Sequence, residues 1–336
     1  MKRFTTGLVV GKFAPLHCGH ERLINAALAQ CETVLLLSYS VPELPGCEPE
    51  KRQRWLQLRF PQCQSLVLMP ERVAQWQLPA IPQNDDPADT HRHYVATVCE
   101  QVFQQHPQAV FTGEDYGDGF AAVLSARFNQ PVTHVRLQRG TQADAPSGTL
   151  IRADVHRHRA LLAEEVYRDF VFRICLLGGE STGKSTLAQA LAAALHTDFV
   201  AEFGREYWEA KHGELSYDDL LHIARTQVKR EDAAHPAQYL VCDTSPLTTL
   251  FYTLHQFGQA PEELHQLAER PYSLIILCDT DFAFVQDGTR QGEAFRHLQQ
   301  AWYERELARR RLPFIRVSGA LTERVAQILA HLSTLH

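Results

Sequence analysis

Residues 178–185 of this chain read Gly-Gly-Glu-Ser-Thr-Gly-Lys-Ser and fit the pattern G-x-x-x-x-G-K-[ST] at every required position. The apolar run 172–177 before them predicts a strand, and residues 186–195 after them predict a helix. In that context backbone N–H groups and the helix N-terminus cradle phosphates, a lysine reaches the outer phosphates, and a serine hydroxyl can bind Mg²⁺. The expected ATP-binding residues are Gly178, Gly179, Glu180, Ser181, Thr182, Gly183, Lys184, Ser185 and Thr186, with Lys184 also catalytic and Ser185 a metal ligand.

About half of the chain precedes this loop, although a domain of this kind normally begins near its first strand. With 336 residues, the chain is long enough for two domains. Strands and helices alternate on both sides of the loop, which predicts parallel sheets. We therefore expect two three-layer α/β domains, 1–165 and 171–336, the first Rossmann-like and the second built around the phosphate-binding loop.

Composition narrows the class of partner. A formal net charge of −6 gives no electrostatic reason to expect nucleic acid binding, so a small-molecule substrate is favoured. The eight cysteines form no C-x-x-C pair, and Cys175, Cys242 and Cys278 lie in apolar runs typical of buried strands. There is no secretory signal and no apolar stretch long enough for a membrane span, so we expect a cytoplasmic protein that does not bind membranes.

The first half carries a second strand, turn and helix. A strand at 7–11 is followed by Lys12 and Phe13, then by His17-x-Gly19-His20 at a helix start. The H-x-G-H pattern resembles the signature of nucleotidyltransferases, in which charge on the α-phosphate and on departing pyrophosphate must be stabilised. His17 and His20 are the expected catalytic residues, and Gly11, Lys12, Phe13 and Gly19 are expected to contact ATP.

Two further segments extend this candidate site. Ser147-x-Thr149-x-x-Arg152 resembles the S-x-T-x-x-R element of nucleotidyltransferases, and its hydroxyls and arginine suit the outer phosphates of ATP. Glu114 and Tyr116 follow a predicted strand at the edge where open α/β sheets bind ligands, so they are expected to contact substrate.

The second half supplies acceptor and metal candidates. Residues 198–208 are interpreted as a strand ending in a charged, aromatic cluster. Glu202, Arg205 and Tyr207 in that cluster are the expected substrate-binding residues, since nucleoside kinases place an acceptor-binding carboxylate in this region. Asp243 ends an apolar strand and is expected to face Mg²⁺ or to act as the base, a role that Glu202 could take instead. Arg290 and Arg296, on a glycine-containing segment, are expected to form a lid over the phosphates.

Together these motifs resemble the bifunctional NadR-type family from about Gly7 to Val317. The resemblance implies an ATP- and Mg²⁺-dependent kinase that converts nicotinamide riboside to nicotinamide mononucleotide (NMN). It also implies an adenylyltransferase that joins NMN to ATP, giving NAD and pyrophosphate. Some members carry an N-terminal helix-turn-helix, and since this chain begins almost at its first strand, DNA binding is not expected.

Departures from the family and competing interpretations remain. Ser245 stands where some relatives have a second carboxylate, and Pro146 stands where an aliphatic residue is common. Spacing alone also permits a kinase and adenylyltransferase for another vitamin, such as a flavin or pantetheine precursor, or a binding module that senses NAD without turnover. Homo-oligomers are common in the family, but no interface follows from the sequence.

Overall fold

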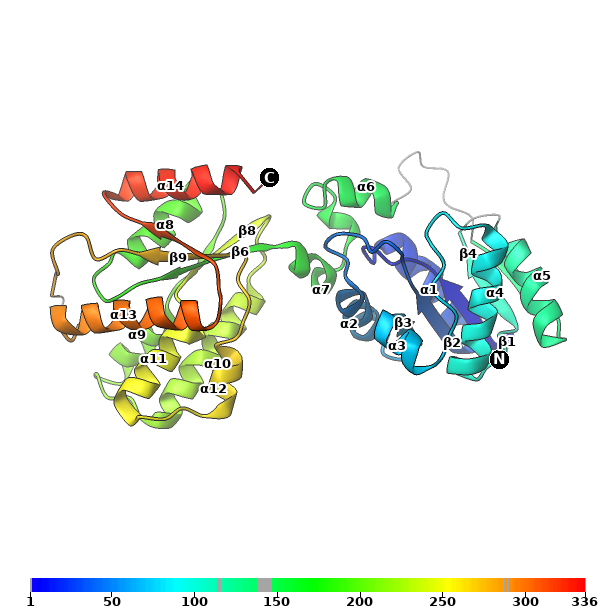
Figure 1. The fold of residues 1–336 in the computed structure, drawn as a ribbon, viewed down its shortest axis with the longest axis horizontal. Coiled ribbons are helices and arrows are strands. Elements are labelled where there is room, and N and C mark those ends of the chain that lie inside the picture. Colours follow the sequence, from blue (N-terminus) through cyan, green and yellow to red (C-terminus); the bar gives the residue numbers. More distant parts are fainter. Residues whose placement is uncertain (1, 114–115, 138–146, 287, 289, 336) are drawn as a thin grey trace. The chain divides into compact units, whose positions relative to one another are not determined.

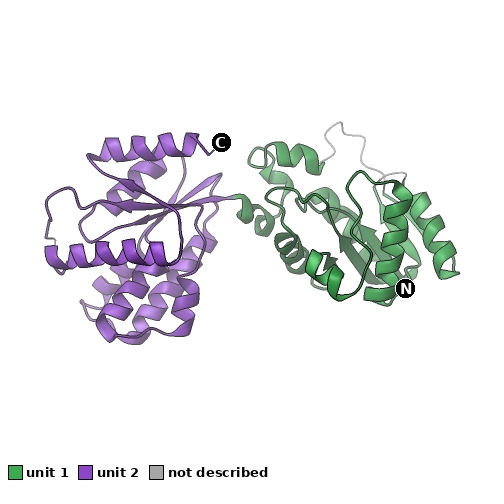
Figure 2. Cartoon of the chain, in the orientation of Figure 1, with its two compact units in different colours: residues 1–170 green, residues 171–336 purple. Residues whose placement is uncertain are grey.

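The computed structural model describes the chain except for residues 1, 114–115, 138–146, 287, 289 and 336 (Figure 1). The chain divides into two compact units, residues 1–170 and 171–336 (Figure 2). Each unit has one parallel five-stranded sheet among its described residues, so the predicted fold class is confirmed.

The sheet of the first unit has the strand order β3-β2-β1-β4-β5. Because β1 pairs with β2 on one side and with β4 on the other, the order in which strands are added to the sheet changes direction at β1. Ligands of open α/β sheets bind at the carboxyl ends of strands at such a point. The strands are β1 (Phe4–Val10), β2 (Cys31–Ser38), β3 (Gln64–Val67), β4 (Ala109–Thr112) and β5 (Thr133–Arg136).

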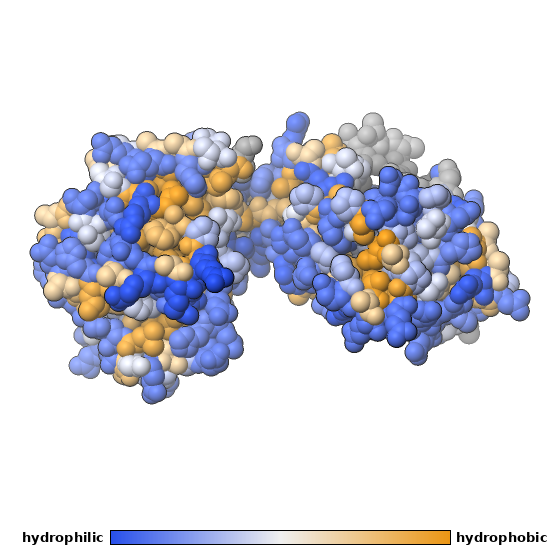
Figure 3. All heavy atoms as spheres, in the orientation of Figure 1, coloured by the Kyte–Doolittle hydropathy of each residue, from blue (hydrophilic) through white to orange (hydrophobic). Residues whose placement is uncertain are grey.

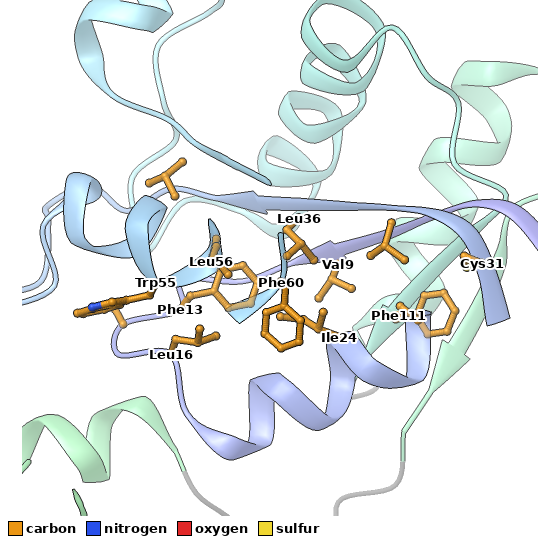
Figure 4. Close-up of a cluster of buried hydrophobic side chains, with 14 of the residues drawn as sticks. Val9, Phe13, Leu16, Ile24, Cys31, Leu36, Trp55, Leu56, Phe60 and Phe111 are labelled. Atoms are coloured by element: carbon orange, nitrogen blue, oxygen red, sulfur yellow. The ribbon is translucent and has the colours of Figure 1, made fainter. Parts of the chain in front are cut away.

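Helices cover both faces of this sheet, so alternate strand residues enter two separate cores. On β1, Leu8 packs into one cluster and Val9 into the other. Figure 4 shows the second cluster, in which Phe13 and Leu16 from the loop after β1 lie among the core side chains. The helices and helical turns are α1 (Cys18–Gln30), α2 (Pro49–Arg59), α3 (Pro70–Gln75), α4 (Ala88–Val98), the π-helix η1 (Cys99–Phe103), α5 (Gly117–Phe128), α6 (Gly148–Ala153), η2 (Arg159–Leu161), α7 (Glu164–Tyr167) and η3 (Arg168–Phe170).

The sheet of the second unit has the order β10-β9-β6-β8-β7, with the strand before the phosphate-binding loop at its centre. On β6, Ile174 and Leu176 face one core, and Cys175 and Leu177 face the other. The strands are β6 (Phe172–Leu177), β7 (Phe199–Val200), β8 (Tyr239–Asp243), β9 (Leu274–Cys278) and β10 (Phe314–Val317). The helices are α8 (Lys184–Ala194), α9 (Phe203–Ala210), α10 (Tyr217–Ala233), α11 (Pro246–Phe257), α12 (Glu262–Leu267), α13 (Glu293–Arg309) and α14 (Leu321–Ser333).

Two local interpretations of the sequence are wrong. Residues 198–208 contain only the two strand residues of β7, and the charged, aromatic cluster after them lies on helix α9. The alternating arginines of His156-Arg157-His158-Arg159 predict a solvated, basic helix face, but the segment is mostly a turn, in which His156 bonds the Tyr167 hydroxyl.

The polarity of the surface, the state of the cysteines and the apolarity of the helices are features of both units. Polar residues cover much of the visible face of each unit, with apolar side chains gathered in smaller areas (Figure 3). All eight cysteines are described and are free thiols, and Cys175, Cys242 and Cys278 are buried as expected. Among the described helices, none combines the length and apolarity that crossing a membrane requires.

Candidate functional site

The loop between β6 and α8 has the backbone conformation that phosphate binding requires. Gly178 has φ +148° and Gly183, which caps α8, has φ +76°. A Cβ at Gly178 would lie 2.8 Å from the Cys278 carbonyl oxygen, so this position needs glycine. The loop therefore leads its N–H groups into the start of α8.

Lys184 lies across this loop. Its Nζ donates to the carbonyl oxygens of Gly178, at 2.9 Å, and Gly179, at 3.1 Å. Thr182 donates to Gly179 O at 2.8 Å, and the Gly179 N–H donates to Gln300 Oε1 at 2.9 Å. The backbone of the loop thus holds the Lys184 ammonium group, which is placed to contact phosphate oxygens.

Ser185 and Asp243 form the pair expected on the metal side. Asp243 is 2 % exposed, and its carboxylate accepts a hydrogen bond from Ser185. Its Oδ1 has no hydrogen-bond partner among the described residues. An unpaired buried carboxylate oxygen beside a hydroxyl fits Mg²⁺, which takes oxygen ligands and keeps several from phosphate and water. The described residues contain no group of three or more His, Cys, Asp or Glu that could hold a metal ion.

Glu202 adds a second carboxyl group at this site. Burial, together with the negative charge of Asp243, raises the pKa of Glu202 to about 7. Burial also raises the pKa of Asp243, opposed by the Ser185 hydrogen bond and by the positive charge of Lys184. A carboxyl group whose pKa lies near neutrality, as that of Glu202 does, is suited to proton transfer.

Lys184, Ser185 and Glu202 line one cavity of about 570 Å³. This volume is ample for a small ligand. The cavity receives residues from the phosphate-binding loop and the start of α8, from α9, α10, α11 and α13, and from segments that connect these elements. The residues that line it are Glu180, Ser181, Thr182, Gly183, Lys184, Ser185, Thr186, Glu202, Gly204, Arg205, Trp208, Gly213, Leu215, Leu220, Ile223, Gln227, Thr244, Thr248, Thr249, Tyr252, His255, Gln256, Arg290, Gln291 and Gln299.

Of the two predicted substrate-binding residues on α9, one lines the cavity and the other does not. Arg205 lines the cavity, whereas Tyr207 lies outside the lining and donates its hydroxyl hydrogen to Asp219 Oδ1 at 2.8 Å. Trp208, which the sequence did not single out, lines the cavity instead. Arg205 and Trp208 are three residues apart and share a face of the helix.

The predicted lid arginines also occupy different places. Arg290 lines the cavity and donates to Ser181 Oγ at 3.2 Å. Glu180 of the loop accepts hydrogen bonds from the Gln291 N–H, at 2.8 Å, and the Tyr252 hydroxyl, at 3.1 Å. Arg296 is 1 % exposed on α13, lies outside the cavity lining, and donates to Phe282 O at 2.9 Å.

The histidines of the first unit lie where β1 ends and α1 begins. His17 caps α1 and accepts from the Gly19 N–H at 3.1 Å, while the His17 N–H meets His20 Nδ1 at 3.5 Å. The two rings stack with centroids 3.8 Å apart, and the Phe13 ring meets His20 edge-on at 5.1 Å. The loop is therefore fixed to the core by Phe13 and presents paired imidazoles at a helix N-terminus.

The Ser147 segment contacts this loop. Ser147 caps α6, and Arg152 donates to the Ala14 carbonyl oxygen of the histidine loop and to Thr149 Oγ1 at 3.1 Å. Burial, and then the positive charge of Arg152, lowers the pKa of Lys12. Two cations and two hydroxyls thus accompany the histidines, a combination suited to a polyphosphate.

A buried arginine that the sequence did not reveal holds the other side of the histidine loop. Arg52 of α2 is fully buried and donates to Lys12 O at 3.2 Å and to Ser38 Oγ at 2.7 Å. Its other amino group pairs with Glu43 at 2.6 Å. The only available signal was an arginine between the apolar residues of a short helix, which is too common to interpret.

Three further residues, Gly11, Tyr116 and Glu114, were predicted to contact ATP or substrate in the first unit. A Cβ at Gly11 would lie 3.1 Å from the Phe13 ring, so the chain packs closely there. Tyr116 is described, is 43 % exposed, and meets Phe120 edge-on with centroids 6.2 Å apart. Glu114 lies outside the described residues.

Comparisons with known proteins agree with this architecture. A family model described as an AAA domain matches residues 173–324. The Trifunctional NAD biosynthesis/regulator protein NadR of Escherichia coli (strain K12) is 26% identical over 317 residues, which are 85% of this chain and 72% of that protein. The protein of the same name from Salmonella typhimurium is also 26% identical over 317 residues, 84% of this chain and 71% of its own length.

Two solved structures share the fold of this chain. A NadR protein in complex with NR superposes with a TM-score of 0.63 at 23% identity, covering 95% of this chain and 90% of that chain. A NadR protein in complex with NAD and AMP-PNP gives 0.62 at 22% identity, covering 95% and 92%.

Fold and site together define a protein of two parallel-sheet α/β domains, the second carrying a phosphate-binding loop beside the carboxyl groups of Glu202 and Asp243. This chain is homologous to the NadR proteins over most of its length.

Proposed function

We propose that the chain is a bifunctional NAD salvage enzyme, with a nicotinamide riboside kinase in residues 171–336 and an NMN adenylyltransferase in residues 1–165. The observation that carries the proposal is the cavity of about 570 Å³ on which the phosphate-binding loop and Glu202 converge, with Asp243 reaching it through Ser185. The NAD biosynthesis named for the two relatives and the NR, NAD and AMP-PNP named for the solved neighbours support the choice of substrates.

In the kinase step the 5′-hydroxyl oxygen of nicotinamide riboside attacks the γ-phosphorus of ATP, its bond to the β,γ-bridging oxygen breaks, and ADP leaves. Glu202 receives the hydroxyl proton, because it lines the cavity while the Asp243 carboxylate is engaged with Ser185. Ser185 and Asp243 would hold Mg²⁺, which when bound would supply charge neutralisation at the phosphates. Lys184 and Arg290 stabilise the charge that develops on the transferred group.

In the adenylyl step a phosphate oxygen of NMN attacks the α-phosphorus of a second ATP, and pyrophosphate leaves. The stacked His17 and His20 stabilise charge at the α-phosphate. Arg152 and Lys12 neutralise the departing pyrophosphate, and the contact of Arg152 with the Ala14 carbonyl supports their placement at one site.

Product analysis tests the proposal directly. Incubation with nicotinamide riboside, ATP and Mg²⁺ is expected to give NMN and ADP, then NAD and pyrophosphate, as resolved by chromatography. NMN supplied with ATP should give NAD without the first step. If neither NMN nor NAD forms, the proposed function is wrong.

The pH profile of the kinase step tests Glu202. Because its pKa is raised to about 7, a growing fraction of the carboxyl group is protonated as pH falls below 7, and the protonated form cannot accept the hydroxyl proton. The kinase kcat/KM should therefore fall by up to about tenfold per pH unit below 7 and level off above it. Glu202→Gln should lower the plateau and flatten this limb, and a limb that persists in the variant would assign the titration to another group.

A further inference from the structure

Two buried glutamines leave polar atoms unpaired at the kinase cavity. Gln227 of α10 is 2 % exposed and Gln299 of α13 is 1 % exposed, and both line the cavity. Neither Gln227 Nε2 nor Gln299 Oε1 has a hydrogen-bond partner within the described residues. Buried amides are nearly always paired, so an unpaired donor and an unpaired acceptor at one cavity indicate a ligand that completes them.

Hydrogen bonds fix which end of each amide remains unpaired. Gln227 Oε1 accepts from the Phe203 N–H at 3.0 Å, which leaves its NH₂ group as the unpaired donor. Gln299 Nε2 donates to the Tyr303 hydroxyl oxygen at 3.5 Å, and that hydroxyl donates to Thr248 Oγ1 at 2.7 Å. This chain of donors leaves the Gln299 carbonyl oxygen as the unpaired acceptor.

We propose that Gln227 and Gln299 recognise a primary carboxamide on the acceptor and thereby select carboxamide-bearing ribosides over their carboxylate counterparts; this rests on the proposed kinase function. A carboxamide offers one carbonyl oxygen to the Gln227 NH₂ group and one NH₂ group to the Gln299 carbonyl. A carboxylate can accept from Gln227 but has no hydrogen for Gln299. It would place a negatively charged oxygen against the unpaired carbonyl, and a site built to bond an N–H group rejects an analogue that lacks it.

A panel of acceptors separates the two contacts without altering the protein. Nicotinamide riboside satisfies both glutamines, 3-acetylpyridine riboside keeps the carbonyl oxygen but lacks the NH₂ group, and pyridine riboside lacks both. The kinase kcat/KM should fall in that order, by about tenfold to a hundredfold for the first loss, as one unpaired buried group produces. Nicotinic acid riboside should be rejected at least as strongly as the acetyl analogue.

Substitutions at Gln299 then assign the NH₂ contact. Gln299→Met keeps the size of the side chain and removes its carbonyl, so nicotinamide riboside and 3-acetylpyridine riboside should become equal within about threefold. Gln299→Glu keeps an oxygen for the carboxamide and should retain the preference. The matched control is Gln256→Met, because Gln256 lines the same cavity but already donates to Leu215 O at 3.3 Å, and it should not change the ratio.

Thermal unfolding and the adenylation of added NMN by the same full-length variants report whether they fold. The inference is overturned if the wild-type chain phosphorylates nicotinamide riboside and its acetyl analogue equally well, or if the preference survives Gln299→Met. If the wild-type chain phosphorylates none of these ribosides, the proposed kinase function itself is wrong. A preference that Gln299→Met abolishes and Gln299→Glu retains supports the inference.

Discussion

Lys184→Met is expected to reduce the conversion of nicotinamide riboside to NMN by about a hundredfold to a thousandfold, the cost of removing one preorganised charge contact from a transition state. In the structure the Lys184 ammonium group is held by the carbonyl oxygens of Gly178 and Gly179 beside the cavity, so its position is set before phosphate arrives. Methionine keeps the length of the side chain but carries no charge. The loss should appear mainly in kcat, since the charge contact strengthens as phosphate charge develops.

The same variant should leave the adenylation of added NMN unchanged, because the two units each have their own sheet and cores. Lys229→Met is the matched control, because Lys229 is an exposed lysine of the same unit on α10. Both reactions are measured on one preparation by chromatography of NMN and NAD. Loss of NMN adenylation in Lys184→Met would contradict two separate sites.

The sequence predicted the parts of the sites that depend on the order of residues along the chain. The glycines of residues 178–185 and the H-x-G-H turn specify backbone conformations directly, and in the structure the Ser147 segment meets the histidine loop through Arg152 and Ala14. The alternation of strands with helices also predicted both parallel sheets, because parallel strands need crossover connections, which are usually helices.

The sequence does not predict which residues of α9 line the cavity, because this segment is a helix where a strand was expected. The likeness to nucleoside kinases points to this segment as a whole, so it does not separate Arg205 from Tyr207. As a helix the segment places Arg205 with Trp208, and Tyr207 turns toward Asp219.

Some buried polar residues stand at helix positions whose periodicity in the sequence is that of the core. Gln227 continues the stripe of Leu220, Ile223 and Ala224 on α10, and Gln299 lies in the stripe of Arg296 and Tyr303 on α13. A polar residue at a position that helical periodicity assigns to the core requires a partner. What the sequence could not supply is which elements face one another across the cavity, since that depends on strand order.

His20→Ala is expected to have the opposite effect to Lys184→Met: NMN adenylation should fall by about a hundredfold or more, while NMN formation from nicotinamide riboside is retained. The His20 ring stacks on His17 at 3.8 Å, and its Nδ1 meets the His17 N–H, so it stabilises the cap of α1 as well as any phosphate bound there. Alanine therefore removes an imidazole from the α-phosphate position and loosens its neighbour.

Two measurements separate these contributions. His20→Asn retains a hydrogen-bonding side chain and should recover part of the helix cap but little of the adenylation, because the imidazole ring is still missing. The matched control His93→Ala removes an exposed histidine from α4 of the same unit and should adenylate NMN as the wild-type chain does. If His20→Ala adenylates NMN normally, phosphate stabilisation in the first unit rests on Arg152 and Lys12, and the assignment of the histidines is wrong.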